Sequence, residues 1–439
     1  MASYPIKWFS YDMTGIPQLT RTPGELTTLL DAVLVNGFNA KSAATLTRVG
    51  TTATMTFATS PGFVKDQIVL VENCDQAEYN GEQRVTTVGA NTITFDVAAT
   101  AVTPATTSSA IACKAAPLGF EIAFTATNRR VYRSKNVASL RPYIRVDNDA
   151  LSGWVAGHNI GGRVVVGLSM SDIDTFTAEY MPYRSDITSF PAAGWGHWYY
   201  AMGAQSGYYA SSYPANANNK NFVVVADDRS FYFLLSLTTQ TNYASSSVGN
   251  TRIIYGAGDF LSYKPNDAFA QWLWCCENYV TAETSSGSSN QSTGMPYSAN
   301  FDRANRTGRL VTRNYLGFGV HARVGAFTLD TNGTTTFRSG ADTGVMWPNY
   351  PNFGLLLHPV YLSEDTSTVR GVQPGLYAIH NNAGTAIPDK LVVDNVTGYG
   401  NKKFMLLLAD TAVDYGSTIW TANSDGRVAF DITGPWSYA

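Results

Sequence analysis

The side chains that could do chemistry in this sequence are few and widely spaced. None of the five histidines lies in a His-x-His, His-Glu-x-x-His or Cys-x-x-Cys pattern that would indicate a metal site. Two acidic pairs stand out, Asp172 with Asp174 and Asp227 with Asp228. Carboxylates at such a spacing can bind calcium or flank a glycosidic bond, but polar turns between strands have the same composition. Whether Asp172 and Asp174 bind an ion stays open at this point.

No motif in the sequence indicates catalysis. The Gly-x-Gly segments at 317–319 and 398–400 lack the strand–helix context of a phosphate-binding loop, and there is no Gly-x-Ser-x-Gly nucleophile elbow. A depolymerase would also need a repetitive β-helix sequence, which is missing. We therefore expect no enzyme, no catalytic residue, no cofactor and no bound metal.

The most unusual local composition is a cluster of aromatic residues among glycine and serine. It includes Trp195, Trp198, Tyr208 and Tyr209. Tyr and Trp in such a setting can stack on sugar faces or anchor a protein interface, and they can equally well alternate into the core of a β-sandwich. All three interpretations stay open, and we treat the four residues as interface candidates.

One amphipathic helix is predicted near the start of the chain, over about 23–36. The segment Thr22-Pro-Gly-Glu25 has the pattern of a capping box, with Pro at the first helical position. The apolar stripe that follows has helical spacing, and its first members are Leu26, Leu29, Leu30 and Val33. This stripe must dock on the same chain or on a neighbouring subunit, so these four residues are interface candidates too.

From residue 44 the hydrophobic period changes from 3.6 to 2, which predicts short strands between Gly and Asn turns. Five strands in 44–113 predict a small β-barrel or sandwich, and the Ala/Thr/Pro-rich segment 98–109 is expected to be the linker that leaves it. Longer, aromatic-rich strands follow without a second amphipathic helix, which excludes parallel α/β folds. We predict an all-β chain with four parts: an N-terminal segment with the helix (1–43), the small inserted module (44–113), a larger antiparallel β-sandwich body (114–340) and a C-terminal β domain (341–439).

The composition favours a protein whose surface is largely in contact with other protein. Of the 439 residues only 14% are charged, where about 25% is usual. Aromatic residues make up 13% of the chain. Interface cores lose charge and gain Tyr, Trp and Phe. The 30 basic and 33 acidic residues give a net charge of −3, which excludes nucleic-acid binding by bulk electrostatics.

Four cysteines are too few for a disulfide scaffold, and the adjacent Cys275 and Cys276 would point to opposite faces of a strand. We expect reduced, buried thiols, as in a protein made in a cytosol. The first residues lack the apolar core of a secretory signal. There is no run of 18 apolar residues, so we expect no membrane-spanning helix.

A series of motifs resembles a family of virion structural proteins that long-tailed, Mu-like bacteriophages carry in their tail-gene clusters. The motifs occur in the same order over nearly the full length: Pro5-Ile-Lys-Trp-Phe9, Leu29 to Phe38, Ala77-Glu-Tyr-Asn-Gly81, Asn128 to Ser134, Met170 to Asp174, Asp227 to Phe233 and Asp431-Ile-Thr-Gly-Pro-Trp436. The segments 195–213 and 280–345 depart from the pattern.

The resemblance implies a structural subunit of the phage tail end, a baseplate or tail-tip component that supports host attachment. It implies a virion location after synthesis in the host cytoplasm. The implied partners are other tail proteins and copies of the chain itself, as a trimer or hexamer, without nucleic acid or membrane insertion. The alternative is a receptor- or carbohydrate-binding module whose aromatic loops contact glycans of the host surface.

The last motif has a predicted geometry of its own. Gly434-Pro435 predicts a turn, because Pro fixes its own φ and restricts the residue before it. Asp431 is expected to bond the backbone of that turn. The turn would aim Trp436 either into its own domain or into a pocket on a neighbouring subunit, so Trp436 is the last interface candidate.

Overall fold

The computed structural model confirms the predicted all-β fold class. Its described residues form four antiparallel sheets of seven strands each and one short helical segment near the N-terminus. None of its helices is long and apolar enough to cross a membrane, within the residues described. The structure describes residues 4–20, 22–105, 110–149, 160–183, 196–201, 219–235, 252–277, 308–327, 357–365, 368–379, 388–394, 396, 398–409 and 427–436.

The central sheet is buried on both faces. Every residue of its inner strands β15 (Phe222–Ala226), β16 (Ser230–Leu235) and β17 (Ile253–Asp259) is buried. The sequence shows this as apolar runs without alternation, such as Phe222-Val-Val-Val-Ala226. In spatial order the strands are β1 (Lys7–Ser10), β15 (Phe222–Ala226), β16 (Ser230–Leu235), β17 (Ile253–Asp259), β19 (Gln271–Trp274), β21 (Arg309–Val311) and β22 (Ala322–Arg323).

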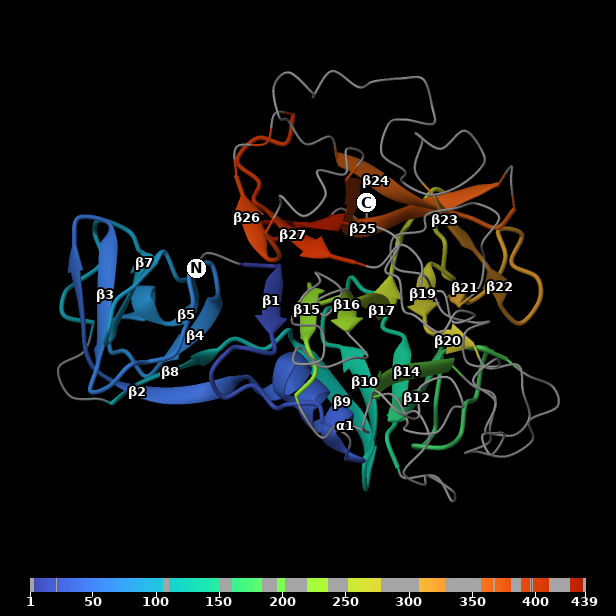
Figure 1. Ribbon diagram of the computed structural model, residues 1–439, viewed down its shortest axis with the longest axis horizontal. Helices are drawn as coiled ribbons and strands as arrows, with labels where there is room; N and C mark the ends of the chain where they lie inside the picture. The colour runs from blue at the N-terminus through green and yellow to red at the C-terminus, as the bar shows by residue number, and fades with distance from the viewer. Residues whose placement is uncertain are drawn as a thin grey trace, which may run out of the picture.

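Two other sheets cover the two faces of the central sheet, one below it and one above it in Figure 1. Adjacent residues of β16 show the arrangement, because neighbours on a strand point to opposite faces. Phe231 contacts Phe120 and Trp198 of the second sheet, with ring centroids 6.0 and 5.7 Å apart. Tyr232 contacts Phe430 of the third sheet at 5.1 Å. The body is therefore a sandwich of three layers with one continuous hydrophobic core.

Most strands of the second sheet precede β15 in the chain, and most strands of the third sheet follow β22. The second contains, in order, β20 (Cys276–Glu277), β14 (Gly196–Ala201), β12 (Ile160–Gly167), β11 (Tyr143–Asp147), β10 (Arg129–Ser134) and β9 (Phe120–Ala126), with β13 (Tyr180–Met181) beside β12. The third contains β23 (Gly325–Phe327), β24 (Leu357–Ser363), β25 (Val369–Ile379), β28 (Arg427–Asp431), β27 (Phe404–Leu408) and β26 (Leu391–Val393), with β18 (Leu261–Ser262) beside β25.

The main hydrophobic core extends across the expected boundary near residue 340, and a smaller cluster that includes Leu357 and Phe404 lies wholly after it. The third sheet takes β18 and β23 from before that position. Its residues Phe430 and Trp436 belong to the same hydrophobic core as Phe231 of the central sheet. The C-terminal part is thus a layer of the body, because its inner face is covered by strands from the middle of the chain.

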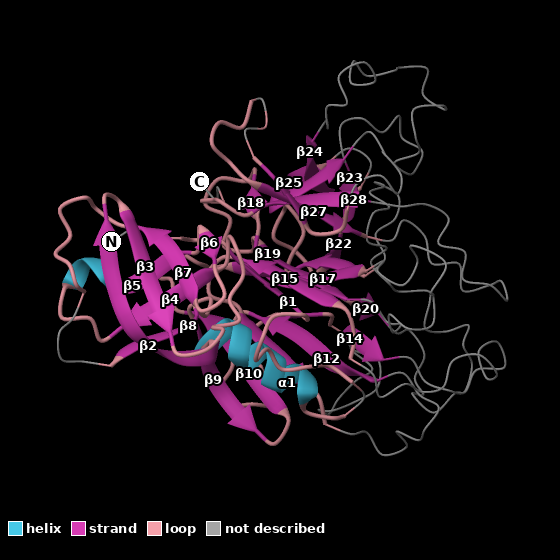
Figure 2. Cartoon of the chain, turned by 60° about the vertical axis from the view of Figure 1, so that its left-hand side comes forward, coloured by secondary structure: helices cyan, strands magenta, loops and turns pink. Residues whose placement is uncertain are grey.

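The remaining sheet forms a module that stands apart from the body in both Figure 1 and Figure 2. Its own hydrophobic core contains only residues between Ala43 and Cys113. A 3-10 turn, η2 (Ala77–Tyr79), follows its third strand along the chain, β4 (Ile68–Glu72). The strand order is β5 (Gly81–Arg84), β4 (Ile68–Glu72), β8 (Ile111–Ala115), β2 (Phe38–Val49), β3 (Thr52–Phe57), β7 (Thr92–Asp96) and β6 (Thr87–Val88).

The module is longer at both ends than the predicted 44–113. Strand β2 begins at Phe38, which pairs with Ala115 of β8. The segment 98–109, expected to be a leaving linker, contributes Ala101 and Ala105 to the module core. The chain therefore enters and leaves the module through two paired strands.

A fragment of residues 38–115 is expected to fold alone and to give a dispersed amide NMR spectrum, because its core is complete within those bounds. The shorter fragment 44–113 is the control, and it lacks the β2 residues that pair with β8. We expect it to unfold at a lower urea concentration. Poor amide dispersion in the NMR spectrum of the 38–115 fragment would show that the module needs the body in order to fold.

The predicted helix is present, but it begins later than residue 23 and changes form halfway. Helix α1 spans Glu25–Leu30 and continues as a π-helical segment, η1 (Asp31–Asn36). Gly24 is the N-cap and has a φ of 88°, which L-residues with side chains rarely adopt. This conformation prevents the helix from starting at Pro23.

A residue far away in the sequence caps the helix. The Oδ1 atom of Asn148 accepts hydrogen bonds from the backbone N–H groups of Gly24 and Leu26, at 2.7 and 3.1 Å. The predicted capping box is present only in part, since the Glu25 carboxylate accepts from the Thr22 N–H at 3.0 Å. Unpaired N–H groups at a helix start need such acceptors.

Replacing Asn148 with Ala is expected to lower the free energy of unfolding by about 1–2 kcal/mol, because the loss of a cap leaves helix N–H groups unpaired. Thr22→Ala is the matched control, since Thr22 is exposed and its backbone N–H remains. Urea unfolding of both variants measures the difference. Equal losses for the two variants would contradict the assignment of Asn148 as the cap.

Candidate functional site

The helix residues named as interface candidates lie in the chain's own core. Leu26, Leu29, Leu30 and Val33 have 0% of their surface exposed. Leu26 lies so close to β12 that a Cβ atom at Gly162 would stand 2.6 Å from its side chain. The interpretation of this stripe as a contact with a neighbouring subunit is wrong, because the same chain already covers it.

The one described member of the aromatic interface candidates, Trp198, also lies in the chain's own core. Trp198 is 0% exposed and donates its Nε1–H to the carbonyl of Trp274 at 2.8 Å. It is a core residue between the second and central sheets, which corrects its place among the interface candidates. Trp195, Tyr208 and Tyr209 lie outside the described residues.

Trp436 also fills a site in its own chain. It is 5% exposed, and its ring lies directly over Gly375. The predicted turn is present, since Asp431 Oδ1 accepts from the N–H groups of Thr433 and Gly434 at 2.9 and 3.0 Å. The Trp436 Nε1–H in turn donates to the Asp431 carbonyl at 3.0 Å. The prediction that Trp436 packs into its own domain is therefore correct, and the prediction that it fills a pocket on a neighbouring subunit is wrong.

The acidic pair at 172 and 174 forms a polar turn that arginines neutralise. Asp172 accepts a hydrogen bond from the backbone N–H of Asp174 at 2.9 Å. The Asp174 carboxylate pairs with Arg129 at 2.9 Å and with Arg145 at 2.6 Å. Two cations on one carboxylate offset the negative charge that a metal ion would need. The described residues contain no group of three or more potential metal ligands.

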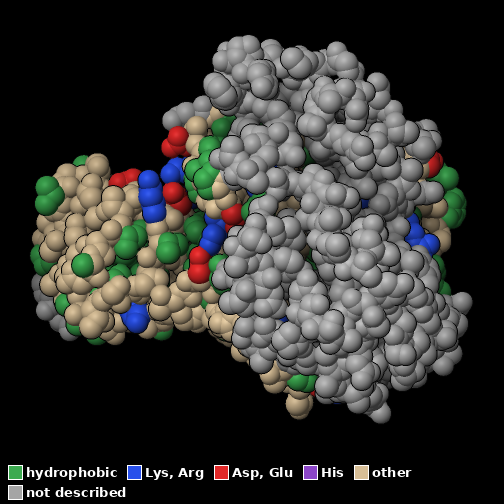
Figure 3. All heavy atoms as spheres, in the orientation of Figure 1, with side chains coloured by type: hydrophobic (Ala, Val, Ile, Leu, Met, Phe, Trp, Pro, Cys, Tyr) green, Lys and Arg blue, Asp and Glu red, His purple; other side chains and the backbone are tan. Residues whose placement is uncertain are grey.

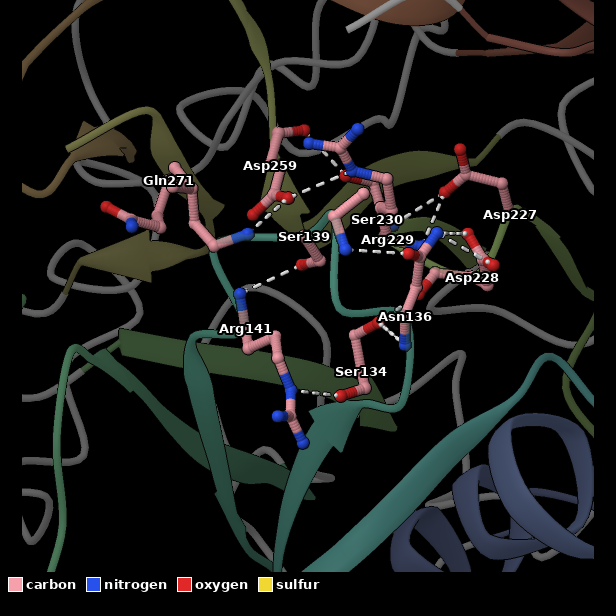
Figure 4. A network of polar contacts seen from close by, with 12 residues as sticks. Ser134, Asn136, Ser139, Arg141, Asp227, Asp228, Arg229, Ser230, Asp259 and Gln271 are labelled. Carbon is pink, nitrogen blue, oxygen red and sulfur yellow. Dashed lines mark hydrogen bonds and ion pairs between the residues drawn. The ribbon is translucent and has the colours of Figure 1, made fainter. Parts of the chain in front are cut away.

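The acidic pair at 227 and 228 belongs to a polar network between the central and second sheets, shown in Figure 4. Asp227 Oδ1 accepts from the backbone N–H groups of Arg229 and Ser230, at 2.8 and 2.7 Å. The Asp228 carboxylate accepts from Asn136 Nδ2 at 3.0 and 3.1 Å. Asp227 therefore closes the β15–β16 turn, and Asp228 holds that turn to the loop after β10.

Asp259 completes this network from the end of β17. It accepts from the Leu140 N–H at 3.0 Å and from Arg229 Nε at 3.2 Å. Burial raises the pKa of Asp259, although the hydrogen bonds from Leu140 and Ser139 and the charge of Arg229 act against that rise. The network fixes the loop 135–142, on which Val137 is 86% exposed.

His197, His321 and the four cysteines pack against or bond other groups of the fold. His197 stacks on Tyr199 with ring centroids 5.0 Å apart, and His321 Nδ1 accepts from a backbone N–H at 3.1 Å. All four cysteines are free and buried, as the sequence predicted. Burial raises the pKa of Cys74 to about 11 and moves that of Cys113 upward as well. Thiols of this kind stay protonated and unreactive at neutral pH.

A buried ion pair links the central sheet to the third sheet. Arg252, which is 0% exposed, donates to both carboxylate oxygens of Asp389 at 2.9 and 2.7 Å. Asn221 Oδ1 accepts two further bonds from the same guanidinium. Asp389 also accepts from the Leu408 N–H at 3.0 Å. Burial disfavours the charge of Asp389, but the hydrogen bonds and charge of Arg252 outweigh it and lower the pKa of Asp389 below 3.8.

This pair predicts a defined loss of stability in acid. A carboxyl group with a lowered pKa in the folded state stabilises the fold above its unfolded pKa, and that stability is lost as pH falls through the folded value. We therefore expect the free energy of unfolding to fall more steeply for the wild type than for Asp389→Asn as pH decreases below about 4. Urea unfolding between pH 6 and pH 3 measures this, and parallel curves would contradict it.

The module is attached to the third sheet by charged groups. Asp66, which is buried, accepts from Lys403 Nζ at 2.7 Å. Arg84 donates to the Ile432 carbonyl at 2.9 Å. These contacts join residues more than 300 positions apart, so the orientation of the module depends on the C-terminal layer.

Sequence reasoning missed an exposed apolar loop between β21 and β22. Leu316, Phe318 and Val320 are 72%, 70% and 42% exposed, and we call these three residues the body loop. Single exposed hydrophobic residues are normal, but contiguous groups mark interaction sites. The signal in the sequence is Gly317-Phe-Gly319 with its apolar neighbours Leu316 and Val320, a Gly-x-Gly pattern that also occurs in phosphate-binding loops.

Hydrogen bonds hold this loop in one conformation. Asn314 Oδ1 accepts from the Phe318 N–H at 2.9 Å, and Arg313 Nη1 donates to the Gly317 carbonyl at 2.8 Å. Gly317 and Gly319 have φ values of 82° and 80°, which glycine adopts without strain. Because the loop is ordered before any partner arrives, binding through it would cost little conformational entropy.

No protein-family model matches the chain, and no curated protein matches it in a sequence comparison. What the body loop does is therefore inferred from its own residues and surroundings.

Proposed function

We propose that this chain is a structural subunit of the tail end of a long-tailed bacteriophage, a baseplate or tail-tip component. Its partners are other tail proteins and copies of itself, and it supports host attachment from within the virion. The observation that carries the proposal is the body loop, where three hydrophobic side chains are held in solvent by a hydrogen-bonded frame. The ordered sequence motifs support the assignment to a phage tail.

The proposed role is not enzymatic. The carboxylates that could act as acid–base pairs are engaged elsewhere, since Asp174 is neutralised by two arginines and Asp227 and Asp228 bond a turn and a loop. Glycoside hydrolysis needs two carboxyl groups, and the neighbour of the exposed Asp172 is committed to those arginines. These contacts instead give a rigid scaffold, which suits a permanently assembled subunit.

Immunogold labelling of phage particles tests the proposal. Antibodies against the purified chain should label particles made from the genome that encodes it, at the end of the tail away from the head. The chain should also sediment with intact particles after nuclease treatment. Recovery of the chain only in the soluble fraction of the lysate, with unlabelled particles, would refute the structural role.

One observation favours the alternative of a carbohydrate-binding module. Tyr263 is 51% exposed and lies beside Lys264, whose Nζ stands 5.6 Å from the centre of the Tyr315 ring. Exposed tyrosines with polar neighbours can stack on sugar rings. A glycan array with the purified chain tests this, and signal that is lost in Tyr263→Ala would support it.

A further inference from the structure

Two paired strands connect the module to the body, and their pairing is irregular where they leave the body. Phe38 of β2 and Ala115 of β8 pair with each other and belong to the hydrophobic core of the body. Cys113, two positions before Ala115 on β8, belongs to the core of the module. Between Phe38 and residue 41 the register of β2 shifts, and Asn39 has a φ of 53°. A bulge of this kind bends a strand and interrupts its pairing, so we call residues 38–41 the hinge.

The hydrophobic cores of the module and the body are almost separate. The core of the module contains no residue of the three body sheets. Of the described module residues other than Phe38 and Ala115, Val64 is the one that packs against the core of the body. A large hydrophobic interface prevents two domains from moving relative to each other, whereas a mostly polar one permits it. The position of the module is therefore fixed mainly by its polar contacts.

Three polar contacts hold the module against the body. Lys403 Nζ donates to Asp66 Oδ1 at 2.7 Å, and Lys7 Nζ pairs with Glu82 Oε1 at 2.8 Å. Arg84 lies two positions after Glu82 on β5, the edge strand of the module, and donates to a backbone carbonyl of the C-terminal layer at 2.9 Å. We call these three contacts the latch. Figure 3 shows basic and acidic side chains beside one another along the boundary between the module and the body.

The charges of the latch favour the closed position only while they are paired. In both ion pairs one side chain is 29% exposed, while the other, Lys7 or Asp66, is 6% or 7% exposed. A buried charge that loses its partner is strongly unfavourable, because neither a counter-ion nor water stabilises it. Movement of the module away from the body would return that charge to water. Ion pairs with a partly exposed member are also weak and are screened by salt.

We propose that the module is an arm with two positions, which turns about the hinge at residues 38–41 and is held against the body by the latch. In the closed position, which the structure shows, all three latch contacts are made. In the open position both hydrophobic cores stay intact and the latch charges are hydrated. A neighbouring subunit that prefers the open position has only to offset these polar contacts, because neither core unfolds. The inference goes beyond the proposed function, since it concerns the isolated chain.

Double electron–electron resonance between two spin labels on the purified full chain measures the position of the module. The labels are attached through Val49→Cys at the end of β2 and Val137→Cys on the body, two positions that are 85% and 86% exposed. The four native cysteines are buried, so the labels should react with the introduced thiols. At physiological salt we expect one narrow distance distribution when the latch residues are unchanged.

Lys403→Gln combined with Glu82→Gln removes the exposed member of both ion pairs and should add a second, separate distance. High salt should change the distribution of the unaltered latch in the same direction, because it screens the same charges. Lys390→Gln is the matched control, since Lys390 is 24% exposed and pairs with Asp12 inside the body, and it should keep the single distance. An unchanged single distance in the double variant would overturn the proposal, and so would a second distance in the control.

Near-UV circular dichroism of the same samples distinguishes opening from loss of structure. The double variant should keep the spectrum of the wild type, because side-chain packing in both cores is unchanged in the open position. A second distance that appears only together with a lost near-UV signal would show that the latch is needed for folding, and it would overturn the proposal. Either negative result leaves the immunogold test of the tail location unaffected, so the two proposals fail separately.

Discussion

Trp436→Ala is expected to lower the free energy of unfolding of the isolated chain by about 3–5 kcal/mol, because a large aromatic side chain leaves a packed site. The Trp436 ring fills the space over Gly375 and contacts the ring of Tyr232 with centroids 5.8 Å apart. Its removal also leaves the Asp431 carbonyl without the Nε1–H donor. A thermal melt of the purified variant measures the loss.

Two variants serve as controls for this prediction. Trp436→Phe keeps part of the ring and should lose less stability than the alanine variant. Phe318→Ala removes an aromatic ring that is 70% exposed and should leave the melting temperature unchanged. If Trp436→Ala melted like the wild type and failed only in particle assembly, the ring would have to contact another subunit.

Arg145→Met is expected to lower the free energy of unfolding by about 3–5 kcal/mol, because it breaks a buried ion pair and leaves the buried Asp147 carboxylate with Arg163 as its remaining cation. Arg145 and Asp147 both have side chains that are 0% exposed, and they are 3.3 Å apart. Arg145 also pairs with Asp174 and donates from Nε to the Ile173 carbonyl at 2.7 Å. Methionine fills a similar volume but satisfies none of these acceptors. Urea unfolding at neutral pH gives the value.

Arg129→Met is the matched control for Arg145. Arg129 pairs with the same carboxylate, Asp174, but its side chain is 24% exposed. Water can solvate the carboxylate in place of a partly exposed cation. We therefore expect Arg129→Met to lower the free energy of unfolding by less than about 1 kcal/mol. A similar loss for both variants would mean that burial does not decide the strength of this network.

Local patterns in the sequence were sufficient for the type of each element. The alternation in 52–57 predicted a strand, and β3 (Thr52–Phe57) shows the corresponding alternation of buried and less buried residues. The apolar spacing after Pro23 predicted a helix, which the structure contains at Glu25–Leu30. The turn before Trp436 was predicted from Gly434-Pro435 and Asp431, whose contacts span only three residues.

Partners that are distant in the chain could not be predicted in this way. The cap on α1 comes from Asn148, 122 positions after Leu26. Asp174 was considered as a metal ligand because the sequence does not show that Arg129 and Arg145 lie beside it. The apolar stripe of Leu26 and Leu30 looks the same whether its cover is the same chain or another one.

The sequence by itself determined that this chain is all-β, with one short helix and a small strand-rich module, because hydrophobic period and turn residues are local properties. Only the tertiary structure decided which surfaces are buried and which remain for a partner. It placed Trp198 and Trp436 in the core and left Phe318 in solvent. The physical reason is that a side chain's burial depends on the strands packed over it, and those strands come from distant parts of the chain.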